Sequence, residues 1–279
     1  MHSTLLRLRL RAGPILACTV VAAAANLCVS ARAAESAPAE PARLTVDAQL
    51  RHSALSAGYD DGDAAAASAT LQLRNGDVAR FEVLQERKFG STGGLLVGSY
   101  VLNFAEVWSV TPTLTVGHGD RNWAKARFDL EAARKWGEGG WLVTRLASFA
   151  AAYDQDRQYT DAGWRLGLSA YLPWQLVADA GVSFNLSQPG QMRSHMPFVA
   201  LTQGGEGSHY LSLRLAHGSE AYLSVGTALT AQVVFDSSTA SLTWRQWLGP
   251  RWGIVAQGER YTNPYYGRTT LGGGVFLQW

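Results

Sequence analysis

The final eleven residues of the chain, Thr269–Trp279, read TTLGGGVFLQW and stop on the largest apolar side chain. Every second residue counted back from the end is apolar or small: Trp279, Leu277, Val275, Gly273 and Leu271. This period of two predicts a β-strand whose apolar face continues to the last residue. Because chain ends are usually frayed and wet, such a strand indicates either a protein core or a surface that faces lipid.

The beginning of the chain predicts export. Residues 1–33 read MHSTLLRLRLRAGPILACTVVAAAANLCVSARA, with a basic leader, an apolar stretch over Pro14–Val29 and an Ala-Arg-Ala site at Ala31–Ala33. This order is that of a secretory signal peptide, and the apolar stretch is too short to span a bilayer comfortably. We expect a signal peptide over 1–33, a short Pro/Ala-rich lead-in over 34–42, and one domain over 43–279.

The composition of the chain argues against several classes of protein. Both cysteines, Cys18 and Cys28, lie in the leader, so the mature chain is expected to hold no disulfide. The leader also takes four arginines from the 24 basic residues, which leaves 20 against 22 acidic ones and a net charge of about −2. No basic excess remains to bind nucleic acid. No later segment has the apolar run of a membrane helix, so a membrane location requires a closed barrel.

Apolar and polar residues alternate along the mature chain in segments of about ten residues, as transmembrane barrel strands do. Over residues 124–132, for example, apolar residues alternate with Lys125, Arg127, Asp129 and Glu131. A soluble β-sandwich also alternates. The runs of charge opposite an unbroken apolar face, together with the export signal, favour a watery lumen surrounded by lipid.

The pattern predicts an all-β fold: a single transmembrane antiparallel β-barrel of about 14 strands, with 12 or 16 strands as the alternatives. The expected strands are 44–57, 66–74, 78–89, 94–107, 111–118, 123–136, 139–153, 160–172, 174–187, 193–203, 207–217, 237–248, 251–262 and 267–279. With a periplasmic C-terminus, the short links fall on the periplasmic side and the longer polar links outside. For the links to alternate between the two sides in this way, residues 219–236 must form one outer excursion rather than two further strands.

Tryptophan marks the expected membrane boundary. All 10 tryptophans follow the leader, and most lie beside short turns, where a ring can be buried in lipid while its N–H stays wet. The expected aromatic girdle is Trp108, Trp136, Trp141, Trp174, Trp247 and Trp252. The closing strand also resembles the C-terminal assembly signal of outer-membrane barrels, carried here by Gly274, Leu277 and Trp279. Leu277 departs from that signal, because an aromatic residue is commoner at its position.

Two C-terminal segments carry a family resemblance. They are GSHYLSLRLAHGSEAY (207–222) and SLTWRQWLGPRWGIVAQGERY (241–261), the second with an R-x-W-L-G-P-x-W-G pattern over Arg245–Gly253. Together with the closing strand they resemble the YaiO family of outer-membrane β-barrels. The resemblance implies the barrel fold and the outer-membrane location. Some family members carry helical repeats before the barrel, whereas this chain has only AESAPAEPA. Because related barrels occur beside polysaccharide export systems, the resemblance also suggests glycan handling by association.

Catalytic and metal-binding patterns are weak. The histidines are scattered, with no H-x-x-x-H or H-E-x-x-H pair, and no G-x-S-x-G occurs. We therefore expect no metal site, no cofactor and no enzyme activity. The residues expected to line the lumen are Arg80, Glu82, Glu86, Lys125, Arg127, Asp129, Glu131, Arg165, Asp179, Arg214 and Arg245. Their charges fit two readings, a structural network that fills a narrow barrel and a selectivity zone in an open pore.

The expected function is a passive channel or transport conduit in the outer membrane, with saccharides as candidate solutes. The alternatives are an outer-membrane enzyme that acts on lipid or lipopolysaccharide, and a barrel with a purely structural or adhesive role. The expected partners are outer-membrane lipid and lipopolysaccharide around the barrel and the barrel assembly machinery during biogenesis. Nucleic acid is not expected as a partner.

Overall fold

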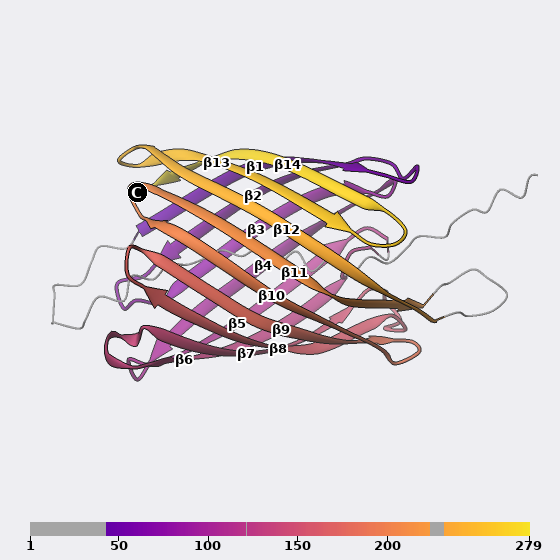
Figure 1. The fold of residues 1–279 in the computed structure, drawn as a ribbon, viewed down its shortest axis with the longest axis horizontal. Helices are drawn as coiled ribbons and strands as arrows, with labels where there is room; N and C mark the ends of the chain where they lie inside the picture. The colour runs from indigo at the N-terminus through magenta and orange to yellow at the C-terminus, as the bar shows by residue number, and fades with distance from the viewer. Residues whose placement is uncertain (1–42, 121, 224–231) are drawn as a thin grey trace, which may run out of the picture.

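The computed structural model describes residues 43–120, 122–223 and 232–279. The expected signal peptide and lead-in, 1–33 and 34–42, lie outside these residues. Fourteen strands form one closed barrel in which each strand pairs antiparallel with its sequence neighbours, and β1 pairs with β14 (Figure 1). The sequence prediction of a single all-β barrel with 14 strands is confirmed, and the alternatives of 12 and 16 strands are wrong.

The strands follow the chain in order around the barrel. They are β1 Arg43–Leu55, β2 Gly62–Gln72, β3 Val78–Lys88, β4 Ser91–Phe104, β5 Trp108–His118, β6 Ala126–Trp136, β7 Leu142–Ala152, β8 Thr160–Leu172, β9 Leu176–Gln188, β10 Met192–Gly205, β11 His209–Leu223, β12 Gln232–Gly249, β13 Trp252–Thr262 and β14 Gly267–Gln278. A single 3-10 turn, Glu138–Gly140, joins β6 to β7. Among the described residues no helix has the length and apolar character needed to cross a membrane.

The largest boundary difference lies at residues 219–236, expected as one outer excursion. The structure continues β11 to Leu223 and begins β12 at Gln232, and the two residues pair with each other. The segment is therefore mostly hairpin, although the expectation that it adds no further strands is correct. The period of two did not predict these strand ends, because Val233, Val234 and Phe235 are consecutive apolar residues and show no alternation.

A second difference concerns residues 108–110, which fall in the link between the expected strands 94–107 and 111–118. These residues belong to β5, and the turn lies at 105–107, where Ala105 and Glu106 have positive φ values of 50° and 60°. Pro112 has no N–H to give to a ladder. Accordingly the β4–β5 pairing runs through Ser99 and Thr113, is interrupted beside Pro112, and resumes at Leu102 and Val110.

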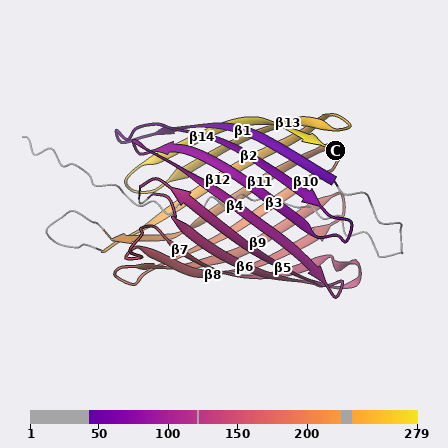
Figure 2. The same cartoon turned by 180° about the vertical axis from the view of Figure 1, so that it is seen from behind.

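The two ends of the barrel differ in their links. The turn end carries Trp279 and the links 73–77, 105–107, 137–141, 173–175, 206–208 and 250–251; the loop end carries the links 56–61, 89–90, 119–125, 153–159, 189–191 and 263–266. At the turn end the backbone of Trp279 exchanges hydrogen bonds with Leu44, at 2.9 and 3.0 Å. The barrel is therefore closed to its last residue, and Figure 2 shows β1 beside β14 at this seam.

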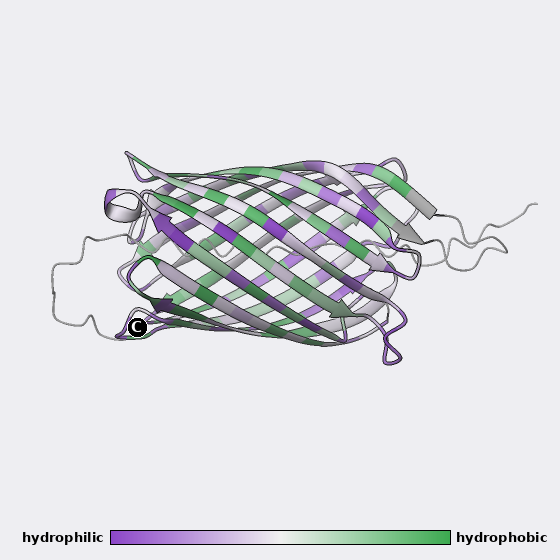
Figure 3. Ribbon diagram, turned by 90° about the horizontal axis from the view of Figure 1, so that it is seen from below, coloured by the Kyte–Doolittle hydropathy of each residue, from purple (hydrophilic) through white to green (hydrophobic). Residues whose placement is uncertain are grey.

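Apolar side chains point outward. On the closing strand, Leu271, Val275, Leu277 and Trp279 are exposed, while Phe276 between them is fully buried inside the barrel. Figure 3 shows hydrophobic and hydrophilic residues alternating along the strands. An exposed apolar surface of this extent on every side is costly in water and suits contact with lipid.

The outward face can be tested by charge. Leu114 on β5 is 56% exposed on the outer face, so Leu114→Arg should cost roughly 2–4 kcal/mol if it lies near the bilayer midplane. Its neighbour Thr113 faces the lumen directly opposite Asp129, so Thr113→Arg should be tolerated. Urea titrations of the refolded barrel in lipid vesicles would measure both changes. Equal stability of the two variants would contradict the assigned facing.

Candidate functional site in the barrel lumen

The lumen is lined by charge. Ten of the eleven residues expected there lie on strands with their side chains on the inner face, and each of the ten is partly buried. The eleventh, Lys125, precedes β6 at the loop end, where its ammonium group donates a hydrogen bond to the Gly119 carbonyl oxygen. Placement in the lumen does not assign a role to these residues, and their part in selectivity stays a prediction.

Most lumen charges form ion pairs across short distances. Arg80 pairs with Glu82 at 2.8 Å and Arg245 pairs with Asp47 at 2.6 Å. Arg127 donates two hydrogen bonds to Asp129, at 2.8 and 2.6 Å. Towards the loop end, Lys88 lies 3.5 Å from Glu86 and Arg268 lies 2.7 Å from Glu259. Facing charges of opposite sign thus neutralise much of the lining.

The pairs remain within reach of water. The charged side chains of the lumen pairs keep 12–34% of their surface exposed. In a solid plug the same groups would be dry, and unsolvated ion pairs carry a heavy desolvation cost. The lumen pairs therefore keep side-chain surface that water can reach.

Arg145 is a central lumen residue that the sequence analysis left unassigned. Its guanidinium lies 3.7 Å from Glu131 and 3.9 Å from Asp179. Ser169 links the cluster further, because its hydroxyl accepts a hydrogen bond from Arg145 and donates one to Asp179. Phe149, an aromatic residue, shares the inward face of this strand with Arg145, so hydropathy alone does not identify which face is polar. In the sequence, the charge of Arg145 was the feature that could have identified the lumen-facing side of the strand.

Three lumen phenylalanines repeat one packing arrangement. Phe149, Phe198 and Phe276 each pair across the ladder with a glycine: Gly163, Gly181 and Gly253, respectively. A Cβ at Gly163 would lie 2.8 Å from the Phe149 ring, and one at Gly181 would lie 2.7 Å from the Phe198 ring. The missing side chains thus let the rings lie flat against the barrel wall, as aromatic residues do over sheet glycines.

Each of these rings carries an arginine. The guanidinium carbon lies over the ring centroid at 4.4 Å for Arg127 on Phe149, 3.8 Å for Arg214 on Phe198 and 3.6 Å for Arg245 on Phe276. Cation–π contact of this kind fixes the guanidinium plane while its N–H edges stay free to donate. The glycine, the ring and the arginine therefore act as one unit that holds a cation in place at the lumen wall.

At the turn end, the lumen holds a small apolar core around Trp247. Trp247 was expected in the girdle, but it is only 7% exposed and packs inside the barrel against Val255, Phe276 and Tyr210. Its indole N–H donates to the Gln278 side-chain oxygen at 2.8 Å. The girdle assignment of Trp247 is therefore wrong, because residue 247 occupies the inward phase of β12.

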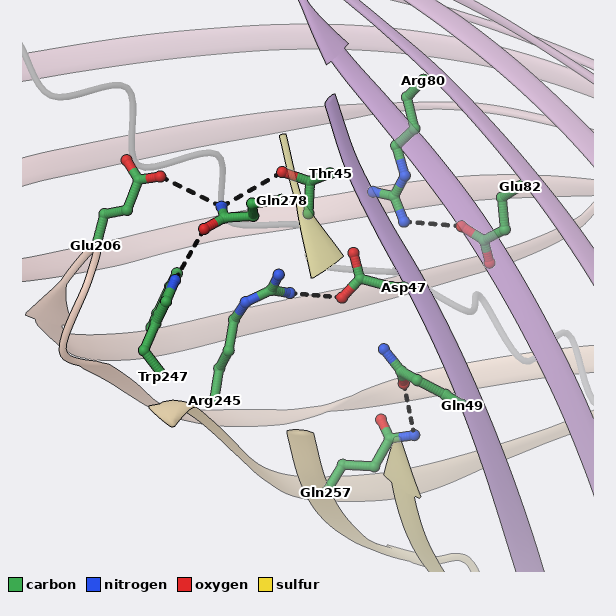
Figure 4. A network of polar contacts seen from close by, with 10 residues as sticks. All are labelled: Thr45, Asp47, Gln49, Arg80, Glu82, Glu206, Arg245, Trp247, Gln257 and Gln278. Atoms are coloured by element: carbon green, nitrogen blue, oxygen red, sulfur yellow. Dashed lines mark hydrogen bonds and ion pairs between the residues drawn. The ribbon is translucent and has the colours of Figure 1, made fainter. Parts of the chain in front are cut away.

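Figure 4 shows the polar contacts around this core. Gln278 donates to Thr45 and to Glu206, both at 3.3 Å, and Gln257 donates to Gln49 at 3.2 Å. The Arg245–Asp47 pair lies beside them. These contacts join β12, β13 and β14 to β1, so the inner face of the closing seam is bonded as well as its backbone.

The other girdle residues lie on the outer surface at the turn end. Trp108, Trp136, Trp141, Trp174 and Trp252 are all exposed there, as is Trp279. A belt of amphipathic rings at one end fits a membrane–water boundary. The role of Gly274, Leu277 and Trp279 in assembly stays a prediction, although Gly274 has a structural reason of its own, since a Cβ there would lie 2.6 Å from Cγ of Gln49.

At the loop end, aromatic rings join three neighbouring links. Tyr59, Phe89 and Tyr266 lie with ring centroids 5.4–5.8 Å apart, and Tyr261 lies 5.5 Å from Tyr266. Burial raises the pKa of Tyr266 to about 12, so its phenol stays protonated at physiological pH. The cluster packs the loops against one another and presents no titrating group.

Two serine–histidine pairs escaped the sequence analysis because they form across strands. His195 lies 2.9 Å from the Ser219 hydroxyl, and His217 lies 2.9 Å from that of Ser238. Nucleophilic catalysis also needs a group that orients the histidine. In the described part of the chain neither histidine has a carboxylate within ion-pair distance, and no group of three or more His, Cys, Asp or Glu could hold a metal ion.

Comparison with known proteins gives a family and a fold. The model of the YaiO membrane beta barrel domain matches residues 44–223, which is more than half of the chain. The R-x-W-L-G-P-x-W-G segment lies beyond that match. A search of curated proteins finds no match.

Solved structures resemble the barrel at low identity. An OmpT variant that lacks loop L8, an outer membrane protein of Vibrio cholerae, aligns with a TM-score of 0.50 at 9% identity, over 87% of this chain and 100% of that one. The Acinetobacter baumannii outer membrane protein Omp33 aligns with a TM-score of 0.50 at 10% identity, over 85% and 99%. At such identity the likeness shows the fold alone.

The need for a glycine opposite each lumen phenylalanine can be tested by adding a single methyl group. A Cβ at Gly253 would collide with the Phe276 ring and the Gln246 carbonyl oxygen, whereas the nearest atom to a Cβ at Gly273 lies 3.5 Å away. Gly253→Ala should therefore lower the free energy of unfolding by about 1–3 kcal/mol, and Gly273→Ala should have little effect. Chemical denaturation of both variants in detergent would measure this. Equal losses would show that the glycine seat is unnecessary.

Proposed function

We propose that this chain, which belongs to the YaiO family of membrane β-barrels, is an outer-membrane channel through which small polar solutes diffuse passively. The single observation that carries the proposal is the hydrated charge of the lumen. Its ion pairs keep 12–34% of their side-chain surface exposed along the inner face of a closed barrel. Such a lining stabilises water and polar solutes in a pore.

Orientation and surroundings follow from the same proposal. We place the turn end, with its short links and tryptophan belt, in the periplasm and the loop end outside, as is usual for such barrels. Lipid and lipopolysaccharide then surround the apolar outer face. We also propose that residues 1–33 direct export and that the barrel assembly machinery recognises the closing strand. Neither proposal depends on conduction.

Saccharides are the proposed class of solute. The inner face of β5 presents hydroxyl groups at Ser109, Thr111, Thr113 and Thr115, and the inner face of β12 presents further ones at Ser237, Thr239 and Ser241. Hydroxyl rows and arginines can exchange hydrogen bonds with a sugar as it loses water. A catalytic role is less well supported, because the two serine–histidine pairs have no orienting carboxylate among the described residues. Turnover of phospholipid by the purified barrel would overturn this view.

The channel proposal is tested by electrical recording in planar lipid bilayers. The folded barrel should produce stepwise conductance. Ala147→Trp places a large ring beside the lumen cluster of Arg145 and Glu131, so it should reduce the single-channel conductance. Ala150→Trp, on the outer face of the same strand, should leave the conductance unchanged. Absence of steps from a barrel whose folding is shown by heat-modifiable gel mobility would refute the proposal.

A further inference from the structure

The three ring-stacked arginines of the lumen differ in one respect. Arg127 is neutralised by Asp129 at 2.6 Å, and Arg245 is neutralised by Asp47 at 2.6 Å. Arg214, stacked on Phe198, has no carboxylate within ion-pair distance among the described residues. The same aromatic support is therefore built under a guanidinium that forms no ion pair with any described carboxylate.

A second arginine, Arg165, lines the same cavity as Arg214 and also lacks an ion pair among the described residues. Arg165 donates a hydrogen bond from Nε to the Ser183 hydroxyl at 3.1 Å, and none of the described carboxylates lies within ion-pair distance of it. Arg165 and Arg214 line one cavity of about 120 Å³ on the lumen wall. Two like charges at one cavity repel each other, and an anion between them relieves that repulsion.

The other charges of the cavity are already engaged. Its lining also includes Glu131, Asp179 and Arg145, and Arg145 lies between the two carboxylates at 3.7 and 3.9 Å. Three guanidinium groups therefore face two carboxylates. The cavity has one cation in excess, and the two arginines without ion pairs are the ones left to supply it.

The sequence keeps this cavity hollow. In the ladder, Arg145 pairs with Gly167, and Gly167 lines the cavity without a side chain, while Gly181 next to it gives room for the Phe198 ring. Ala147 and Ala200 contribute only methyl groups to the lining. Phe198 lies over Gly181 and holds the Arg214 guanidinium 3.8 Å above its ring. The plane of Arg214 is thus fixed before any ligand arrives, which lowers the entropy cost of binding.

From this geometry we propose that Arg214 and Arg165 form a subsite that binds the oxyanion of a passing solute, a carboxylate or a phosphate. A guanidinium held by its face offers paired N–H donors along its edge, which match both oxyanions. A cavity of about 120 Å³ takes the charged group, and the remainder of the solute lies in the lumen. The inference rests on the proposed channel for its biological role, but binding itself does not require conduction.

Equilibrium binding on the detergent-solubilised barrel tests the subsite without reference to conduction. The probes are glucuronate, glucose 6-phosphate and glucose, which share a sugar ring and differ in charge. Isothermal titration should show saturable binding of one or both charged sugars and none of glucose. Arg214→Gln should weaken that binding about tenfold or more, because it removes a charge-assisted bidentate contact. Phe198→Leu should weaken it as well, since the guanidinium loses its support.

Arg87→Gln provides the matched control, because Arg87 lies on the outer face of β3 and pairs there with Asp63 at 2.6 Å. It removes the same charge and should leave binding unchanged. Equal binding of glucose and glucuronate, no binding of either charged sugar, or unaltered binding in a folded Arg214→Gln barrel would each overturn the subsite. Anion binding by a barrel that conducts no current would instead refute the channel and leave the subsite standing.

Discussion

Every backbone N–H and C=O that enters a bilayer must find a partner within the protein, because hydrocarbon offers none. In this chain the ladder between β1 and β14 closes the barrel, and two hydrogen bonds between Leu44 and Trp279 continue that ladder to the last residue. A single open edge would leave a row of unpaired groups in lipid. The remaining features follow from closure: an apolar outer face, a polar inner face, and short links that turn the chain back at each end.

Closure of the barrel also determines which side chains the lumen must accommodate. Alternation sends every second side chain inward, so fourteen strands deliver many polar groups to one enclosed space. The charges settle mostly as pairs, and glycines opposite Phe149, Phe198 and Phe276 give flat seats for aromatic rings that steady the arginines above them. These contacts hold the charged side chains in order along the inner wall. Arg214 is held on an aromatic ring in the same way, but no described carboxylate forms an ion pair with it.

The sequence predicts the barrel well because the dominant signal is local. The strand period of two, read from TTLGGGVFLQW and from the charged stretch at 124–132, identifies facing from residues that are adjacent in the chain. The predictions that failed or stayed open depend on contacts between strands. Trp247 lies beside a turn like the girdle residues, but its phase points inward to Phe276. Arg145 and the serine–histidine pairs become visible only once the register brings distant strands together.

The proposed channel requires the inner wall of the folded barrel to be wet within a membrane. The chain has no cysteine after Cys28, so single cysteines report cleanly on their surroundings. Ala200 lines the lumen cavity, and Leu201 beside it points to lipid. In lipid vesicles, a charged, membrane-impermeant thiol reagent should modify Ala200→Cys rapidly and Leu201→Cys hardly at all. If Ala200→Cys is as unreactive as Leu201→Cys in the folded barrel, the lumen is closed to water and the account is contradicted.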